Sequence, residues 1–161
     1  WLIMTNNINI FNNPVEISLR ILILLNIDIN NEYNIEKLTY FDYLMMHSGD
    51  IDNAPDSILP NSPYRFFEFH VNKENISQSV EFLWRKGLVD ISYNANGIFY
   101  KANRLTDLFV KTIQNELCEQ LKHTASWVVD NFYKYSENDL KDLFYSKLKS
   151  KSIDFSKIGA I

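Results

Sequence analysis

The chain has 161 residues, of which 46% are hydrophobic and 22% charged, a mix typical of one folded globular domain and unlike that of a disordered segment. The formal net charge of -4 argues against a surface that binds nucleic acid throughout, because neutralising phosphates takes clustered Lys and Arg. A single cysteine, Cys118, excludes an intramolecular disulfide and a Cys-based zinc cluster. It fits a reducing compartment, so we expect a cytoplasmic protein.

No segment of the sequence is typical of a membrane protein. The longest uninterrupted apolar run, Ile21 to Leu25, is far shorter than the ~20 residues that span a bilayer. The N-terminus lacks the basic segment and the cleavage site of a signal peptide. Met4 is a candidate translation start, which would place Trp1 to Ile3 upstream of the native chain.

The first predicted helix begins at Asn13. Asn13, Pro14 and Glu16 supply an N-cap, a first-turn proline and a first-turn acid. The apolar residues that follow lie on nearly all sides of the helix, which predicts a position in the middle of a core or an interface. They are Val15, Ile17, Leu19, Ile21, Leu22, Ile23, Leu24 and Leu25.

A second helix is predicted from Ile35 to about His47, on the spacing of its apolar residues. Gly49 is predicted to end it, because glycine readily adopts the left-handed conformation on which helices end. The chain from there to Pro63 contains three prolines among Asp, Asn and Ser and is predicted as a loop.

Asn72 is predicted to cap a third helix that Gly87 closes at its C-terminal end. Residues 88–93 and 98–102 are rich in β-branched and aromatic side chains, and they flank a turn-forming Asn94-Ala95-Asn96-Gly97. This pattern predicts a β-hairpin that directly follows the helix.

Asn103 is predicted to start a long helical region that reaches Phe132, and Ser136 with Asp139 predicts a capping box at the start of a final helix. The long region has one apolar stripe, formed by Leu105, Leu108, Phe109, Ile113, Leu117 and Leu121.

The order of these elements is that of a winged-helix domain with helical extensions. The predicted fold is therefore mostly α with a β-hairpin wing: a winged-helix-like core over residues 13–102 and C-terminal helices over 103–150, in a single structural unit. The hairpin could equally close a small α+β module.

A polar cluster follows the second helix and could be an active site, a metal site or the end of a helix. The cluster consists of His47, Ser48, Gly49 and Asp50. A metal site would add Asp52 and Asp56. However, a calcium loop that starts at Asp50 would have Pro55 where the EF-hand needs Gly and Asn61 where it needs Glu. We therefore predict a turn motif and no metal.

Candidates for catalysis are few. Cys118 lies in the apolar stretch of a helix, without neighbours that would lower its pKa, so a buried inert thiol is predicted. His70 and His123 stand in no recognisable motif, and the four glycines are too dispersed to bind phosphate. We expect no catalytic residue and no cofactor. A small hydrolase or metalloenzyme remains the alternative among enzymes.

The third helix and the hairpin carry the residues that a winged-helix protein would place on DNA. They are Lys73, Asn75, Gln78, Arg85 and Lys101. Glu74 and Glu81 share that helix and would repel phosphate. A stand-alone DNA-binding regulator is therefore the second hypothesis.

Aromatic residues make up 14% of the chain, and interface cores are enriched in such side chains. We predict a protein interface from the first helix and from two aromatic clusters. Its residues are Ile17, Leu24, Tyr64, Phe66, Phe67, Phe69, Trp127, Phe132 and Tyr133.

Several segments taken together resemble one family: NPVEISLRILILL, FDYLMMHSGDI, PNSPYRFFEFHV, VEFLWRKGLVDISYNANGIFYKAN and TASWVV. From Asn13 to Phe132 they resemble the small middle component of bacterial ABC-three-component systems, the group that includes the third subunit of Lamassu-type anti-phage complexes. The HSGD segment and the wing are the most specific parts. The chain departs from the family pattern over Asp50 to Pro60 and at Val71-Asn72-Lys73.

The resemblance implies a non-enzymatic subunit that associates with an SMC-like (Rad50-like) ATPase and with a separate effector, often a nuclease, in defence against phage or plasmid DNA. DNA would be contacted through the complex. The motor and the nuclease would reside in other chains.

Overall fold

The structure is a computed structural model that describes residues 13–60, 62 and 65–151. Within them the helices are α1 (Pro14–Ile27), α2 (Ile35–Met46), the short 3-10 helix η1 (Ser48–Asp50), α3 (Arg65–Arg85), α4 (Arg104–Thr112), α5 (Glu116–Phe132) and α6 (Glu137–Lys151). Strands β1 (Val89–Asn94) and β2 (Gly97–Ala102) form an antiparallel hairpin. The described part of the chain is thus mostly helical with one two-stranded sheet.

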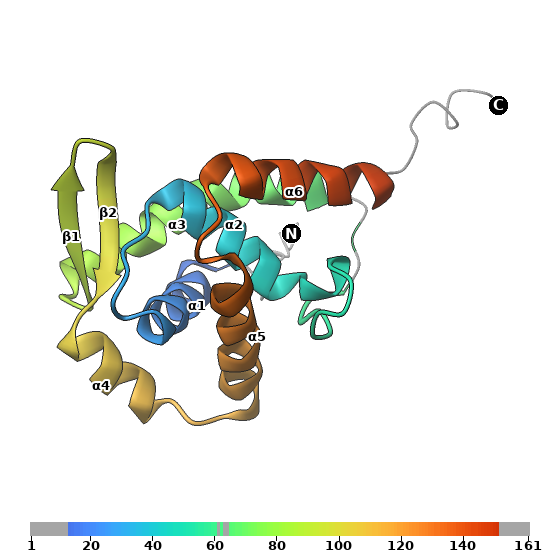
Figure 1. Cartoon of the computed structure of the whole chain (residues 1–161). Helices are drawn as coiled ribbons and strands as arrows, with labels where there is room; N and C mark the ends of the chain where they lie inside the picture. Colours follow the sequence, from blue (N-terminus) through green and yellow to red (C-terminus); the bar gives the residue numbers. More distant parts are fainter. Residues whose placement is uncertain (1–12, 61, 63–64, 152–161) are drawn as a thin grey trace, which may run out of the picture.

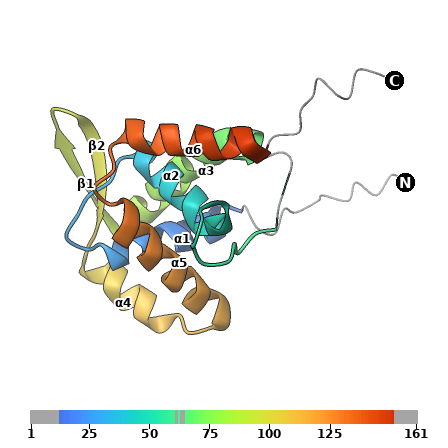
Figure 2. The same cartoon turned by 45° about the vertical axis from the view of Figure 1, so that its right-hand side comes forward.

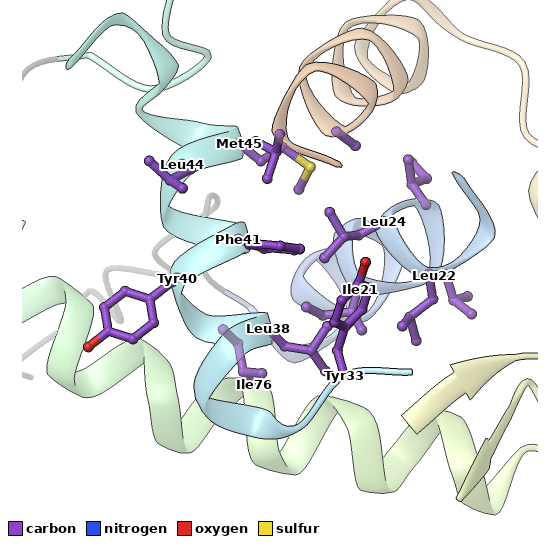
Figure 3. Close-up of a cluster of buried hydrophobic side chains, with 14 of the residues drawn as sticks. Ile21, Leu22, Leu24, Tyr33, Leu38, Tyr40, Phe41, Leu44, Met45 and Ile76 are labelled. Atoms are coloured by element: carbon purple, nitrogen blue, oxygen red, sulfur yellow. The ribbon is translucent and has the colours of Figure 1, made fainter. Parts of the chain in front are cut away.

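Helix α1 lies in the middle of the molecule (Figures 1 and 2). It contacts α2, α3, α4, α5 and β2, which is why apolar residues on several of its sides are buried, although Val15 in its first turn is 71% exposed. Figure 3 shows Leu24 of α1 and Phe41 of α2 pointing toward one another, while Leu22 lies on another side of α1 and Ile76 of α3 lies near Leu38. The predicted central position of this helix is confirmed.

Local capping signals have the predicted effect at three helix ends. The Asn13 side chain accepts hydrogen bonds from the N–H groups of Val15 (3.0 Å) and Glu16 (2.9 Å). Ser136 and Asp139 form the reciprocal bonds of a capping box at α6. Gly87 has φ +70°, the left-handed conformation predicted for it.

The hairpin is joined to the helices by a backbone bridge. Tyr33, between α1 and α2, and Tyr100, on β2, each donate an N–H to the other's carbonyl at 2.9 Å. In the hairpin, Val89 pairs with Ala102, and both are buried at its base. One face of the hairpin thus continues the core.

Two helix boundaries differ from those predicted. Helix α3 begins at Arg65, so Asn72 lies inside it, and the Asn72 side chain donates to Asp42 at 2.7 Å. The region after Asn103 is two helices, since Ile113 has extended backbone and Asn115 caps α5 by accepting from the N–H of Cys118. A local cap, Asn115, marks the break between α4 and α5, and helical periodicity alone records neither boundary.

The C-terminal helices pack on the N-terminal ones. Helices α4 and α5 contact α1, and α6 contacts α2. Helix α6 lies across the molecule on the side opposite α4 (Figures 1 and 2). Among the described residues, no helix combines the length and the apolar character needed to cross a bilayer.

Candidate functional site

The HSGD cluster forms the turn that leaves α2. His47 caps α2 by donating its backbone N–H to the carbonyl of Tyr43 at 2.9 Å, and residues 48–50 form η1. The Ser48 hydroxyl donates to the carbonyl of Asp56 at 3.1 Å, and the N–H of Gly49 donates to Ser57 Oγ at 3.0 Å. The turn is therefore fixed to the loop that follows it.

Gly49 does not have the left-handed conformation predicted for it, because its φ is not positive. The reason for glycine is space: a Cβ at this position would lie 3.0 Å from Ser57 Oγ and 3.4 Å from the backbone nitrogen of Ser57. The prediction that Gly49 ends α2 through its backbone freedom is corrected. Gly49 instead lets the loop approach the turn.

Asp50 is the ionic partner of Arg65 at the start of α3. Both residues are buried, and Arg65 Nη1 pairs with Asp50 Oδ2. The Tyr43 hydroxyl donates to the same carboxylate oxygen at 2.8 Å. Burial and this hydrogen bond raise the pKa of the Tyr43 hydroxyl, which keeps it protonated as a donor. The pair holds the first turn of α3 on the HSGD turn.

A second buried ion pair joins α1 to α2. Arg20 Nε and Nη2 donate to the two oxygens of Asp42 at 2.6 and 3.0 Å, and each residue is 1% exposed. Asn72 of α3 donates to Asp42 Oδ2 at 2.7 Å. Glu16 lies 3.5 Å from Arg20 Nη1, and burial raises the pKa of the Glu16 carboxyl. The bidentate geometry of the Arg20–Asp42 pair is the strongest form of an Arg–carboxylate pair.

A cavity of about 30 Å³ lies between the two ion pairs. Its lining includes Arg20, Asp42, His47, Arg65 and Asn72. Within the described residues, His47 Nδ1, Arg65 Nε and Asn72 Oδ1 are buried without a hydrogen-bond partner. A cavity of this size has room for one or two water molecules, and it is far smaller than the ~300 Å³ at which small-molecule sites begin.

The side chains around this cavity join neighbouring elements to one another. Burial, together with the nearby Arg65, lowers the pKa of His47 to about 4, so the imidazole is neutral near pH 7. No cysteine, serine or threonine lines the cavity. In the described part of the chain, no three His, Cys, Asp or Glu side chains are grouped so as to hold a metal ion. What the arrangement does is tie α1, α2, η1 and α3 together.

The other candidates for catalysis lie apart from this cluster. Cys118 is 1% exposed in α5. His70 on α3 and His123 on α5 are exposed. These three side chains therefore share no site with His47.

Three of the five residues predicted to touch DNA bond to acidic neighbours. Lys73 forms an ion pair with Glu36, and Arg85 forms one with Glu81 at 2.5 Å. Gln78 donates to Glu74 at 3.2 Å. Lys101 stands opposite Asp90 in the hairpin register, and Asn75 is half-buried on α3. Each of these acids reduces the positive potential that phosphate would meet.

Part of the predicted partner interface belongs to the core. Ile17 and Leu24 are fully buried by the chain itself, and Phe69 and Phe132 are nearly so. Phe69 packs on Phe144 of α6 with ring centroids 4.0 Å apart. These four residues are corrected from interface to core, because side chains that the fold already covers offer no surface to another protein.

The remaining interface residues have different positions. Tyr133 is 42% exposed, and Trp127 is half-buried beside Phe132, with ring centroids 5.4 Å apart. Tyr64 lies outside the described residues, as do the side chains of Phe66 and Phe67. Tyr133 is thus the most accessible of the predicted set in the described part.

The two ion pairs are the main feature that the sequence prediction missed, although a signal was present. Arg20 is the one charged residue in the apolar run from Ile17 to Leu25, and Asp42 stands among Phe41, Tyr43 and Leu44. A charge inside an apolar helix needs a buried partner of opposite sign. A buried positive charge in the first helix and a buried negative charge in the second therefore indicate an ion pair between these two helices.

A comparison with protein families identifies the chain. Residues 10–153 match the family described as ABC-three component (ABC-3C) system Middle Component 2. The chain belongs to this family. The predicted resemblance of the chain to the middle component of ABC-three-component systems is thereby confirmed. No curated protein and no solved structure matches the chain, so the fold of this middle component rests on its own structure.

Proposed function

We propose that this middle component is a non-catalytic accessory subunit of an ABC-3C defence system, and that it binds an SMC-like (Rad50-like) ATPase and helps couple it to an effector nuclease. The observation that carries the proposal is the family match over residues 10–153, because a middle component is by definition one part of an assembly. The cluster of buried ion pairs supports a structural role, since its cavity is too small for a substrate.

We also propose that the fold is winged-helix-like. In support, the elements follow one another as α1, the Tyr33 segment, α2, α3 and the hairpin of β1 and β2. The backbone bridge between Tyr33 and Tyr100 joins the segment after α1 to this hairpin. On α3, Lys73 and Arg85 form ion pairs with Glu36 and Glu81. In the hairpin, Lys101 lies opposite Asp90. DNA contact is therefore proposed to occur through the complex and not through this surface alone.

Co-purification tests the proposed function. The full chain, tagged and co-expressed with the products of its neighbouring genes, is expected to elute with an ATPase subunit at a size well above 19.0 kDa. A chain that stays monomeric beside those products would remove the proposal. A gel shift by the isolated chain with a steep salt dependence, lost on changing Arg85 and Lys101, would instead favour the free DNA-binding regulator.

A further inference from the structure

Helix α4 has apolar side chains beyond those that the core can cover. Thr106 and Val110 are buried, on the side where α4 contacts α1 and β2. Leu105, Leu108 and Phe109 are 51%, 49% and 41% exposed. At 3.6 residues per turn, these three span an arc of about 100° beside the buried face. We refer to Leu105, Leu108 and Phe109 as the α4 stripe.

The spacing of the α4 stripe is that of a helix-packing face. Its members stand at i, i+3 and i+4, and Thr112 follows at i+7, the positions that line one side of a helix and pack on a second helix. Helix α4 has nine residues and is thus about 13 Å long. An added helix would run along it for two to three turns.

Two cations border the stripe on the side away from the core. Arg104 and Lys111 are seven residues apart, so both lie about 100–120° from Leu105 on the same edge. Arg104 is exposed and forms no ion pair with a described residue. Lys111 is 69% exposed and pairs with Asp107 at 2.6 Å, so Asp107 offsets part of its charge, and Arg104 supplies the larger share of the positive potential on this edge. This edge therefore favours an occupant with acidic side chains.

A second copy of this chain fits the face poorly. Three half-exposed side chains offer on the order of 250 Å², against the ~800 Å² per partner of a stable interface. A two-fold pair with antiparallel helices would also place the cationic edge of one copy against that of the other. Both features favour a helix of a larger partner that contacts other surfaces as well.

We propose that the α4 stripe binds an amphipathic helix of a partner subunit, with apolar residues on Leu105, Leu108 and Phe109 and acidic residues beside Arg104 and Lys111. This inference rests on the proposed function, because the assembly supplies the partner. Helix α4 lies on the side of the molecule opposite α6 (Figures 1 and 2), so a helix bound along α4 would leave α6 uncovered.

Site-specific photocrosslinking in the full complex tests the inference. Benzoylphenylalanine replaces Leu108 in one variant and Val71, 63% exposed on α3, in a matched control. We expect position 108 to crosslink to a partner subunit, in a peptide with helical apolar spacing and flanking Glu or Asp. Leu108→Glu is expected to weaken retention of that subunit at least tenfold, and Val71→Glu less than twofold.

The outcomes separate this inference from the proposed function. If the wild-type complex assembles and Leu108→Glu leaves it intact, the inference is overturned and the proposed function stands. A crosslink to a second copy, or to a peptide without acidic residues, also overturns it. If the wild-type chain captures no partner, both fail. Equal melting temperatures of the two Glu variants show that neither result comes from unfolding.

Discussion

Replacing Asp42 with Ala removes a carboxylate from the centre of the molecule and leaves the Arg20 guanidinium buried. The change abolishes two bonds to Arg20, of 2.6 and 3.0 Å, and one from Asn72, of 2.7 Å. Glu16 already pairs with Arg20 Nη1 at 3.5 Å, a longer contact that would offset only part of this loss. Breaking a buried ion pair costs about 3–5 kcal/mol, a large share of the ~5–15 kcal/mol that stabilises a domain.

We therefore expect Asp42→Ala to lower the free energy of unfolding by about 4 kcal/mol, which shifts the urea midpoint by about 2 M. The melting temperature should fall by about 8–16 °C for a chain of this size. Urea titration followed by circular dichroism measures the change. Arg85→Ala is the matched control, because its pair with Glu81 is exposed, and it should cost about 0.5 kcal/mol or less.

A double variant tests the reasoning more strictly. Arg20→Met with Asp42→Leu removes both charges and keeps apolar volume, so it should be more stable than Asp42→Ala by at least about 2 kcal/mol. The explanation by an unpaired buried charge is refuted if Asp42→Ala costs less than about 1 kcal/mol, or if the double variant is no more stable than the single one.

Three further predictions concern the turn and a helix end. His47 has a pKa of about 4 in the fold against about 6.5 in the unfolded chain, so the free energy of unfolding should fall by up to about 3 kcal/mol as the pH drops from 6.5 to 4. In urea titrations, His47→Gln should flatten this pH dependence, whereas the control His123→Gln, at an exposed position, should leave the pH dependence unchanged. Gly49→Ala should cost about 1 kcal/mol through the 3.0 Å contact with Ser57, and a cost that persists in a Ser57→Ala background would contradict this reason. Asn115→Ala should lower stability by about 1 kcal/mol by removing the cap of α5, and an unchanged melting curve would show that the cap is dispensable.

Features set by neighbours in the chain could be predicted from the sequence. Asn13 caps α1 and Ser136 caps α6 because each side chain reaches N–H groups two or three residues away. Gly87 and the hairpin that follows it depend on the local backbone in the same way. The family was also evident in the sequence, and the match over residues 10–153 confirms it.

The sequence did not show which apolar residues face a partner. Ile17 and Leu24 stand on an all-apolar helix, a pattern that fits a core and an interface equally well. Only the packing of five elements around α1 showed that the chain covers them itself. Conversely, Leu105 and Leu108 have a spacing typical of a core, and the fold leaves them exposed.

The sequence by itself determined the caps of α1 and α6 and the hairpin, because each of these depends on residues close together in the chain, and it also indicated the family. The tertiary structure decided that Arg20 meets Asp42, that Asp50 meets Arg65, and where α3 begins. The physical reason is that burial and charge pairing depend on which distant segments come into contact. Helical periodicity records which side of a helix is apolar, but not what covers that side.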